Sequence, residues 1–173
     1  MLSIGQKVPD FNFEIFQNNR FSKVHLADYL GKWLVLLFYP ADFTFVCPTE
    51  LSEAEDKYAE FKQLGAEVIS FSTDTVYAHK AWHDSSPVIG KITYPMAADP
   101  NGQICRLVGS YIEAEGLSLR TTLIIDPDGV LKCLEMHDNS IGRSSAEIIR
   151  KLQAAIFVRE NKGEVCPASW HPG

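Results

Sequence analysis

The sequence has few cysteines, no long apolar run and no excess of basic residues, and each shortage excludes a class of protein. Four cysteines in 173 residues are too few and too widely spaced for a disulfide scaffold. A net charge of -6 argues against a nucleic-acid or anionic-membrane partner, which requires a clustered basic face. The apolar run at 33–39 is too short to span a bilayer, and the first twenty residues lack the apolar core of a secretory signal. We therefore expect a cytoplasmic protein with no membrane or nucleic-acid partner.

Three short apolar segments predict buried strands of a parallel sheet, because each is rich in β-branched or aromatic residues. They span residues 33–39, 66–72 and 121–127. Between the first two, apolar residues recur at spacings of three and four over 51–64, which predicts an amphipathic helix that Gly65 ends. These segments together predict a βαβ unit.

The remaining patterns add helices and a hairpin. A helix is predicted over 76–85, and the DPDG turn at 126–129 predicts an antiparallel hairpin. An S-x-x-E capping box from Ser144 to Glu147 opens a final helix. Apolar residues that alternate over 11–15 predict an extra edge strand or hairpin near the N-terminus.

This order of elements predicts a thioredoxin-like α/β fold, with a central mixed sheet, flanking helices and an N-terminal β extension. No repeat and no break in composition marks a second domain. We expect a single domain over residues 1–173, with a flexible C-terminal tail from about residue 162.

Cys47 lies in the stretch PADFTFVCPTE, directly after the first predicted parallel strand. Ligands of open α/β sheets gather at the carboxyl ends of such strands. Pro48 suits the first turn of a helix, because its missing N–H has no intrahelical partner to lose there. A thiol in that turn faces unpaired N–H groups and the positive end of the helix dipole, which favour the thiolate. The position predicts a reactive thiol.

Ionisation of the Cys47 thiol is not by itself enough to make its reaction fast. An unperturbed thiol, with a pKa of about 8.5, is ~3% ionised at pH 7, so full ionisation raises the reactive population roughly thirtyfold. If the substrate is a peroxide, negative charge builds on its departing oxygen, and hydrogen-bond donors must face that atom. Thr44 can supply a hydroxyl, Arg120 is the strongest distant source of a guanidinium, and Pro40 can exclude water.

The pattern P-x-x-x-T-x-x-C, formed here by Pro40, Thr44 and Cys47, is the signature of the peroxiredoxins. Further matching segments are FTFVCPTEL (43–51), STDT (72–75), HKAWH (79–83) and EVCPASW (164–170). From about Ile4 to Trp170, the chain resembles the alkyl hydroperoxide reductase C subfamily of typical two-cysteine peroxiredoxins.

The resemblance implies a role for each matching residue. Cys47 becomes the peroxidatic cysteine, surrounded by Thr44, Pro40 and Arg120. Cys166 becomes the resolving cysteine. Its thiol would condense with the Cys47 sulfenic acid before that acid is over-oxidised.

The resemblance also implies supporting residues and partners. Glu50 and Arg143 would orient Arg120, with Trp82 packed nearby. The Cys47–Cys166 disulfide would join two chains of an obligate homodimer, which we expect to assemble into a ring, a decamer in the subfamily. A flavoprotein reductase or a thioredoxin would reduce this disulfide, and we expect no cofactor and no metal.

Two other functions stay open at this stage. A cysteine acyl-transfer enzyme needs a histidine base, for which His79, His83 and His137 are candidates. His79 and His83 have the i, i+4 spacing of metal ligands, but position 80 is Lys and no third ligand is evident, so a surface or packing role is expected. A chaperone or scaffold role of the oligomer is the second alternative.

The other two cysteines and one missing motif complete the sequence-based expectations. Cys105 and Cys133 lie in apolar patterns and are expected to be small core residues. The oxidation-sensitive members of the subfamily carry a GGLG loop, whereas the comparable region here reads SYIEAEG at 110–116. We therefore expect a mobile tail, rapid disulfide formation and resistance to over-oxidation.

Overall fold

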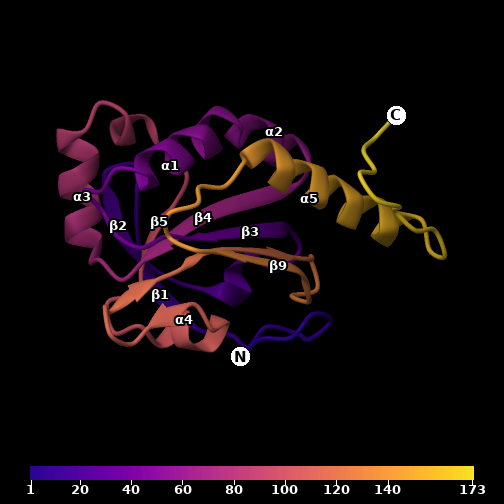
Figure 1. The fold of residues 1–173 in the computed structure, drawn as a ribbon, viewed down its shortest axis with the longest axis horizontal. Coiled ribbons are helices and arrows are strands. Elements are labelled where there is room, and N and C mark those ends of the chain that lie inside the picture. The colour runs from indigo at the N-terminus through magenta and orange to yellow at the C-terminus, as the bar shows by residue number, and fades with distance from the viewer.

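A seven-stranded mixed sheet forms the centre of the computed structural model, which describes residues 1–173 (Figure 1). Its strands, in the spatial order β2-β1-β5-β4-β3-β8-β9, are β1 (Asn12–Gln17), β2 (Arg20–His25), β3 (Trp33–Phe38), β4 (Ala66–Ser72), β5 (Met96–Ala98), β8 (Arg120–Ile125) and β9 (Leu131–His137). β3, β4 and β5 are parallel, and the other pairings are antiparallel. The predicted α/β fold with a central mixed sheet is confirmed.

Helices cover both faces of the sheet. They are α1 (Cys47–Asp56), α2 (Tyr58–Gln63), α3 (Val76–Ser85), α4 (Gln103–Val108) and α5 (Ser145–Glu160), with 3-10 turns η1 (Leu26–Tyr29) and η2 (Ile89–Lys91) and a small hairpin of β6 (Tyr111–Ile112) and β7 (Leu117–Ser118). In Figure 1, α1, α2 and α5 lie over one face, and α4 lies with the N-terminal segment over the other. None of these helices is both long and apolar enough to cross a membrane.

The central strand β3 is buried on both faces, as its unbroken apolar sequence requires. Successive side chains of a strand point to opposite faces. Trp33, Val35 and Leu37 therefore join the hydrophobic cluster beneath α1, α2, α3 and α5, whereas Leu36 and Phe38 join the cluster beneath α4. The sheet thus separates two hydrophobic cores. Because β3 is packed in both cores, the point where the following loop leaves the sheet is fixed.

The predicted N-terminal β extension is a hairpin of β1 and β2. Its two-residue turn is Asn18 and Asn19, which both have positive φ (52° and 58°). Asparagine tolerates this left-handed conformation better than most residues, and two such residues make the turn that suits a hairpin. β1 also pairs with β5 and so attaches the hairpin to the main sheet.

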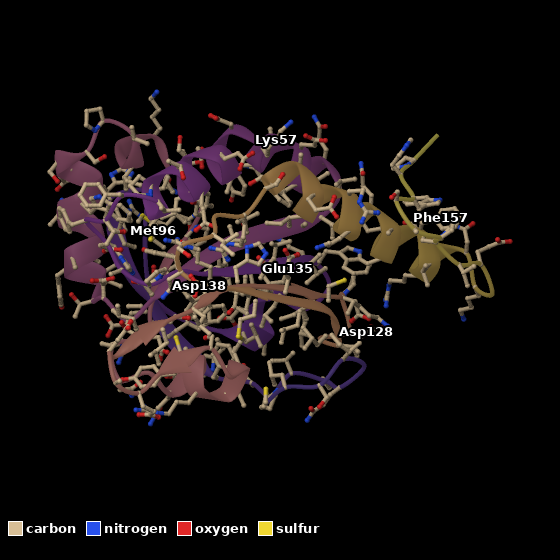
Figure 2. All side chains as sticks on the ribbon, in the orientation of Figure 1. Lys57, Met96, Asp128, Glu135, Asp138 and Phe157 are labelled. Carbon is tan, nitrogen blue, oxygen red and sulfur yellow. The ribbon has the colours of Figure 1, made fainter.

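The single helix predicted over 51–64 is wrong in one respect. The structure has two helices there, α1 and α2, separated at Lys57, whose φ of -100° and ψ of 0° leave the helical region. Lys57 lies where α1 gives way to α2 (Figure 2). The break aims α2 so that the Tyr58 hydroxyl donates to Glu67 on β4 (2.6 Å). The apolar spacing is the same on both sides of Lys57, so the sequence pattern could not reveal the break between α1 and α2.

Candidate active site

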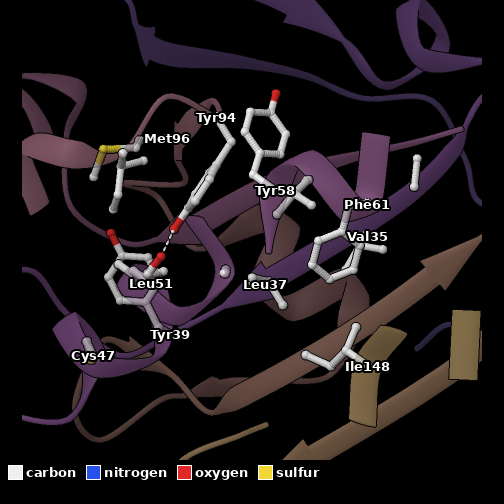
Figure 3. Close-up of a cluster of buried hydrophobic side chains, with 14 of the residues drawn as sticks. Val35, Leu37, Tyr39, Cys47, Leu51, Tyr58, Phe61, Tyr94, Met96 and Ile148 are labelled. Atoms are coloured by element: carbon white, nitrogen blue, oxygen red, sulfur yellow. Dashed lines mark hydrogen bonds between the residues drawn. The ribbon is translucent and has the colours of Figure 1, made fainter. Parts of the chain in front are cut away.

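Cys47 begins helix α1, and Pro48 follows it in the first turn, where the sequence placed it. The thiol is completely buried and belongs to the hydrophobic cluster that includes Tyr39 and Leu51 (Figure 3). Helix α1 is fastened at this end by Tyr94, whose hydroxyl donates to the Leu51 carbonyl (2.9 Å). Cys47 therefore sits on a fixed helix end rather than in a loose loop.

Arg120 reaches Cys47 because β8 runs antiparallel to β3. Phe38, the last residue of β3, pairs with Thr121, so the first residue of β8 lies beside the point where the chain leaves β3 toward Cys47. The Arg120 Nη1 donates to Cys47 Sγ (3.2 Å) and to Glu50 Oε1 (2.6 Å). Its Nε donates to the Asn139 carbonyl (2.9 Å). These three acceptors hold a guanidinium that is only 4% exposed.

Glu50 joins Arg120 to Arg143, which lies in the segment before α5. The Glu50 carboxylate accepts from Arg143 Nε (2.6 Å), from Arg143 Nη2 (3.2 Å) and from the Arg143 backbone N–H (2.8 Å). Burial works to raise the pKa of this carboxyl, but the hydrogen bonds and charge of Arg143, with the charge of Arg120, hold that pKa below its ordinary value. Arg143 is itself fixed by the Thr121 carbonyl (2.8 Å).

The charges of this cluster do not cancel unless Cys47 is ionised. Two guanidinium groups and one carboxylate are buried together, so one positive charge is left over. The nearest group able to balance it is Cys47 Sγ, 3.2 Å from Arg120 Nη1. An unpaired buried charge is strongly unfavourable, so this position stabilises a group that carries negative charge. Burial also works to lower the pKa of Arg120, but its contacts with Cys47 and Glu50 raise that pKa above the ordinary value.

The loop between β3 and α1 carries the other two residues of the P-x-x-x-T-x-x-C pattern. Pro40 is buried at the end of β3, whereas Thr44 is exposed. The Thr44 hydroxyl donates to the Ala41 carbonyl (2.8 Å), which leaves its oxygen free to accept. Trp82 packs beneath this loop against Tyr39 and Phe43, at ring-centroid distances of 6.2 and 5.9 Å. The structure therefore places Trp82 under the loop.

Cys166 is remote from this cluster. The tail after α5 is irregular and, in Figure 1, lies at the far end of α5 from the start of α1. Cys166 Sγ is 3.6 Å from the Ala154 carbonyl of α5. Trp170 packs on Phe157, which Figure 2 shows on α5 beside the tail, with ring centroids 4.9 Å apart. The structure thus brings Cys47, Arg120, Glu50 and Arg143 together and leaves Cys166 outside.

A second buried polar group was not expected at the site. His79 has no exposed side-chain surface and contacts Asp42 of the loop through Nδ1 (2.6 Å). The sequence signal was present, because Val76, His79 and Trp82 share one helix face at spacings of three, and that face is buried. Asp42, which directly precedes Phe43 in the loop, carried no such signal.

These contacts disfavour a cysteine acyl-transfer site. The hydrogen-bond partner of Cys47 Sγ is a guanidinium, which does not act as a base near neutral pH. Both ring nitrogens of His79 are already engaged, by Asp42 and by the Ala97 carbonyl. Cys105 is fully buried, as expected of a core residue, whereas Cys133 is only partly buried. Cys47 is thus the thiol that is paired with a fixed positive charge.

Comparison with known proteins places the chain in a family. The AhpC/TSA family matches residues 4–133. The alkyl hydroperoxide reductase C of Amphibacillus xylanus is 50% identical over 174 aligned positions, which cover 100% of this chain and 93% of that protein. A crystal structure of Enterococcus faecalis AhpC has a TM-score of 0.93 at 47% identity, and the match covers 96% of this chain and 100% of that one.

A more distant structure has the same fold. The reduced 2-Cys peroxiredoxin of Plasmodium vivax also gives a TM-score of 0.93, at 32% identity, over 97% of this chain and 89% of that one. The predicted thioredoxin-like fold is thereby confirmed. The chain belongs to the AhpC/TSA family and is a peroxiredoxin of the alkyl hydroperoxide reductase C type, as its sequence motifs indicated.

Proposed function

We propose that the chain reduces hydrogen peroxide and small organic hydroperoxides, with Cys47 as the attacking thiol and Cys166 as the resolving thiol. The observation that carries this proposal is the contact of Arg120 Nη1 with Cys47 Sγ at 3.2 Å, within a buried cluster that has one positive charge to spare. That charge stabilises the nucleophile before the reaction. It also lies where negative charge appears on the departing oxygen during the reaction.

The first step is a displacement at oxygen. The Cys47 thiolate attacks one oxygen of the peroxide, an S–O bond forms and the O–O bond breaks. Sulfur loses two electrons, and the departing alkoxide or hydroxide takes up a proton to leave as an alcohol or water. The product on the protein is a sulfenic acid.

Thr44, Pro40 and Arg120 have separate tasks in this step. The Thr44 oxygen is free to accept the O–H of the bound peroxide, because its own proton is engaged by the Ala41 carbonyl. Pro40 is buried at the end of β3 and has no N–H that would attract water to this side. Arg120 stabilises charge at both ends of the breaking bond. Glu50 and Arg143 keep its guanidinium in place.

The second step, like the first, requires Cys47 to become accessible. The thiol is fully buried, so the first turn of α1 must open before the sulfenic acid can meet another cysteine. The Cys166 thiol then attacks the Cys47 sulfur, forms a disulfide and releases water. Because the tail of the same chain lies at the far end of α5, a second chain is the better source of Cys166, which makes the working unit a homodimer.

An external dithiol reduces this disulfide and returns both thiols. A flavoprotein reductase and a thioredoxin are the two classes of reductant we propose, and a reducing cytoplasm is the compartment that suits such a cycle. We further propose that the dimers assemble into a ring, which the subfamily resemblance implies is a decamer.

The test mixes two variants that each lack one of the two proposed thiols. Cys47→Ser and Cys166→Ser chains are each treated with hydrogen peroxide, alone and after mixing, and run on a non-reducing gel. We expect a disulfide-linked dimer only in the mixture, because each variant lacks one of the two thiols. A Cys105→Ser, Cys133→Ser double variant is the matched control and keeps the wild-type dimer. If the wild type consumes no peroxide with dithiothreitol as reductant, the proposed function is wrong. If the mixture stays monomeric, the disulfide is not between chains.

A further inference from the structure

A closed polar cluster lies beneath the loop that carries Pro40 and Thr44. Asp42 Oδ1 accepts from the Tyr39 hydroxyl (2.6 Å), and Asp42 Oδ2 contacts His79 Nδ1 (2.6 Å). The Asp42 backbone N–H donates to Asp74 Oδ2 (2.9 Å). The side chains of Asp42 and His79 are completely buried. We call these four residues the Asp42 cluster: Tyr39, Asp42, Asp74 and His79.

The hydrogen bonds of His79 determine where its protons lie. The Ala97 carbonyl, 2.9 Å from Nε2, can only accept, so Nε2 carries a proton. Nδ1 faces a carboxylate oxygen, so one further proton lies between Nδ1 and Asp42. Burial works to lower the pKa of His79, but the hydrogen bond and charge of Asp42 raise that pKa above the ordinary value. One proton is therefore shared between His79 Nδ1 and Asp42 Oδ2, and burial raises the pKa of Asp42 as well.

Stability alone does not account for this pair. A buried ion pair contributes little net stability, and well-packed apolar residues of the same volume often replace it without loss. What the pair does supply is a fixed position, because a bond of this length between two buried side chains tolerates little movement. The position that it fixes is that of the loop backbone at Asp42.

The loop needs such an anchor. Between Pro40 and Cys47, Asp42 is the one buried residue, and Phe43 and Phe45 are 60% and 97% exposed. Phe43 has a φ of +58°, a left-handed conformation that is unfavourable for an aromatic residue and persists only where the surroundings enforce it. The Asp42 cluster holds the residue directly before this strained position.

We propose that His79, acting through Asp42, is a positioning residue for peroxide reduction: it holds the 40–46 loop so that Pro40 and Thr44 face Cys47. This inference rests on the proposed function. The polar partners of His79 are Asp42 and the Ala97 carbonyl, so its effect is on the geometry of the peroxide site and not on the charge of the thiol. A displacement of about 1 Å in a reacting group costs roughly a hundredfold in rate. We therefore expect loss of the His79–Asp42 bond to slow the peroxide reaction by at least about tenfold.

Two substitutions, His79→Asn and His79→Gln, test the two hydrogen bonds of His79 one at a time. Asparagine places its side-chain nitrogen near the position of Nδ1 and can still donate to Asp42, whereas glutamine places its nitrogen near Nε2 and can still donate to Ala97. His79→Asn is therefore expected to react with peroxide nearly as fast as the wild type, and His79→Gln at least about tenfold more slowly. His83→Gln is the matched control. His83 is one turn further along α3, half-buried, and bound through Nε2 to the Ile92 carbonyl (3.0 Å).

The measurement compares two reagents at the same sulfur. In a Cys166→Ser background, oxidation of Cys47 by hydrogen peroxide and its alkylation by iodoacetamide are followed by mass spectrometry. We expect His79→Gln to slow the oxidation while the alkylation rate stays within about twofold of the background rate, because only the peroxide depends on the loop. Tyr39→Phe removes one donor to Asp42 and keeps the ring, and it is expected to slow oxidation by a smaller factor. This variant reports on the proposal even if His79→Gln fails to fold.

Several results would overturn the proposal. Oxidation at the background rate in both His79→Gln and Tyr39→Phe would show that the Asp42 cluster is not needed. Equal losses in His79→Asn and His79→Gln would show that the bond to Asp42 is not the one that matters. A parallel fall in oxidation and alkylation would show that His79 acts on the thiolate. If the background protein itself is not oxidised by peroxide, the proposed function fails instead.

Discussion

Replacement of Glu50 by Gln tests whether the buried charge cluster is as unbalanced as the contacts indicate. The carboxylate accepts four hydrogen bonds, one from Arg120 and three from Arg143, and its side chain is 4% exposed. Glutamine has nearly the same shape but no charge, and its amide group turns two donors toward guanidinium groups. The substitution leaves two buried positive charges with Cys47 as their only counter-charge.

Breaking a buried ion pair by removing one partner costs about 3–5 kcal/mol. We expect Glu50→Gln to lower the free energy of unfolding of the reduced protein by this amount, measured by urea denaturation at pH 7 and one fixed protein concentration. Asp84→Asn is the control. It breaks an exposed i, i+4 pair with Lys80 (2.5 Å) and should cost about 0.5 kcal/mol or less. A loss below about 1 kcal/mol in Glu50→Gln would refute the claim that Glu50 balances a buried charge.

The same pair of proteins gives a prediction on pH. The pKa of Glu50 is lower in the folded chain than its ordinary value of 4.5, so the carboxylate stabilises the fold above that pH. The stabilisation is lost as pH falls below 4.5 and through the lower folded pKa. The difference between wild type and Glu50→Gln should therefore be constant near neutral pH and shrink in the acid range. A difference that grows on acidification would contradict the sign of this pKa shift.

Three further predictions concern other parts of the molecule. Arg120→Lys should slow oxidation of Cys47 by peroxide about a hundredfold in stopped-flow assays, because one ammonium cannot hold the three acceptors that the guanidinium holds; a change below threefold would contradict this. Gly102→Ala should lower the unfolding free energy in urea denaturation by about 2–4 kcal/mol, since φ is +70° and a Cβ would lie 2.5 Å from the Tyr111 ring. Gly163→Ala, at φ +89° with open space, should lose only about 1 kcal/mol in the same measurement. After a large excess of peroxide, mass spectrometry should find Cys47 mostly as disulfide, and dominant sulfinate would contradict rapid resolution.

Local patterns predicted most of the fold. The strand at 33–39 could be found because a strand buried on both faces is apolar without interruption. The predicted end of α3 near Ser85 could be found because Pro87 follows it. The three-residue β5 and the six-residue α4 were missed, since neither is long enough to show a period. Tertiary pairing, not local preference, makes β5 a strand.

At the candidate site, too, local features could be predicted from the sequence and contacts between distant residues could not. The helix start at Cys47 and Pro48 is a local feature and could be derived from their neighbours alone. The contact of Cys47 with Arg120 spans 73 positions in the sequence. The chemistry of a peroxide made Arg120 a candidate and the family resemblance gave it the same role, but no local pattern predicts the contact itself. His79 and Asp42 are 37 positions apart and no local pattern joins them, so only the folded chain shows their pairing.

The spare positive charge of the Arg120–Glu50–Arg143 cluster has a consequence for the reduction potential of the protein. The cluster stabilises Cys47 only while its sulfur carries negative charge, and a disulfide carries none. By linkage, whatever free energy the cluster adds to the thiolate is missing from the oxidised form, which makes the disulfide the better oxidant. Each 1.4 kcal/mol of this preference raises the potential by about 30 mV. The arginines proposed to promote attack on the peroxide would therefore also help the proposed external dithiol to return Cys47 to its reduced state.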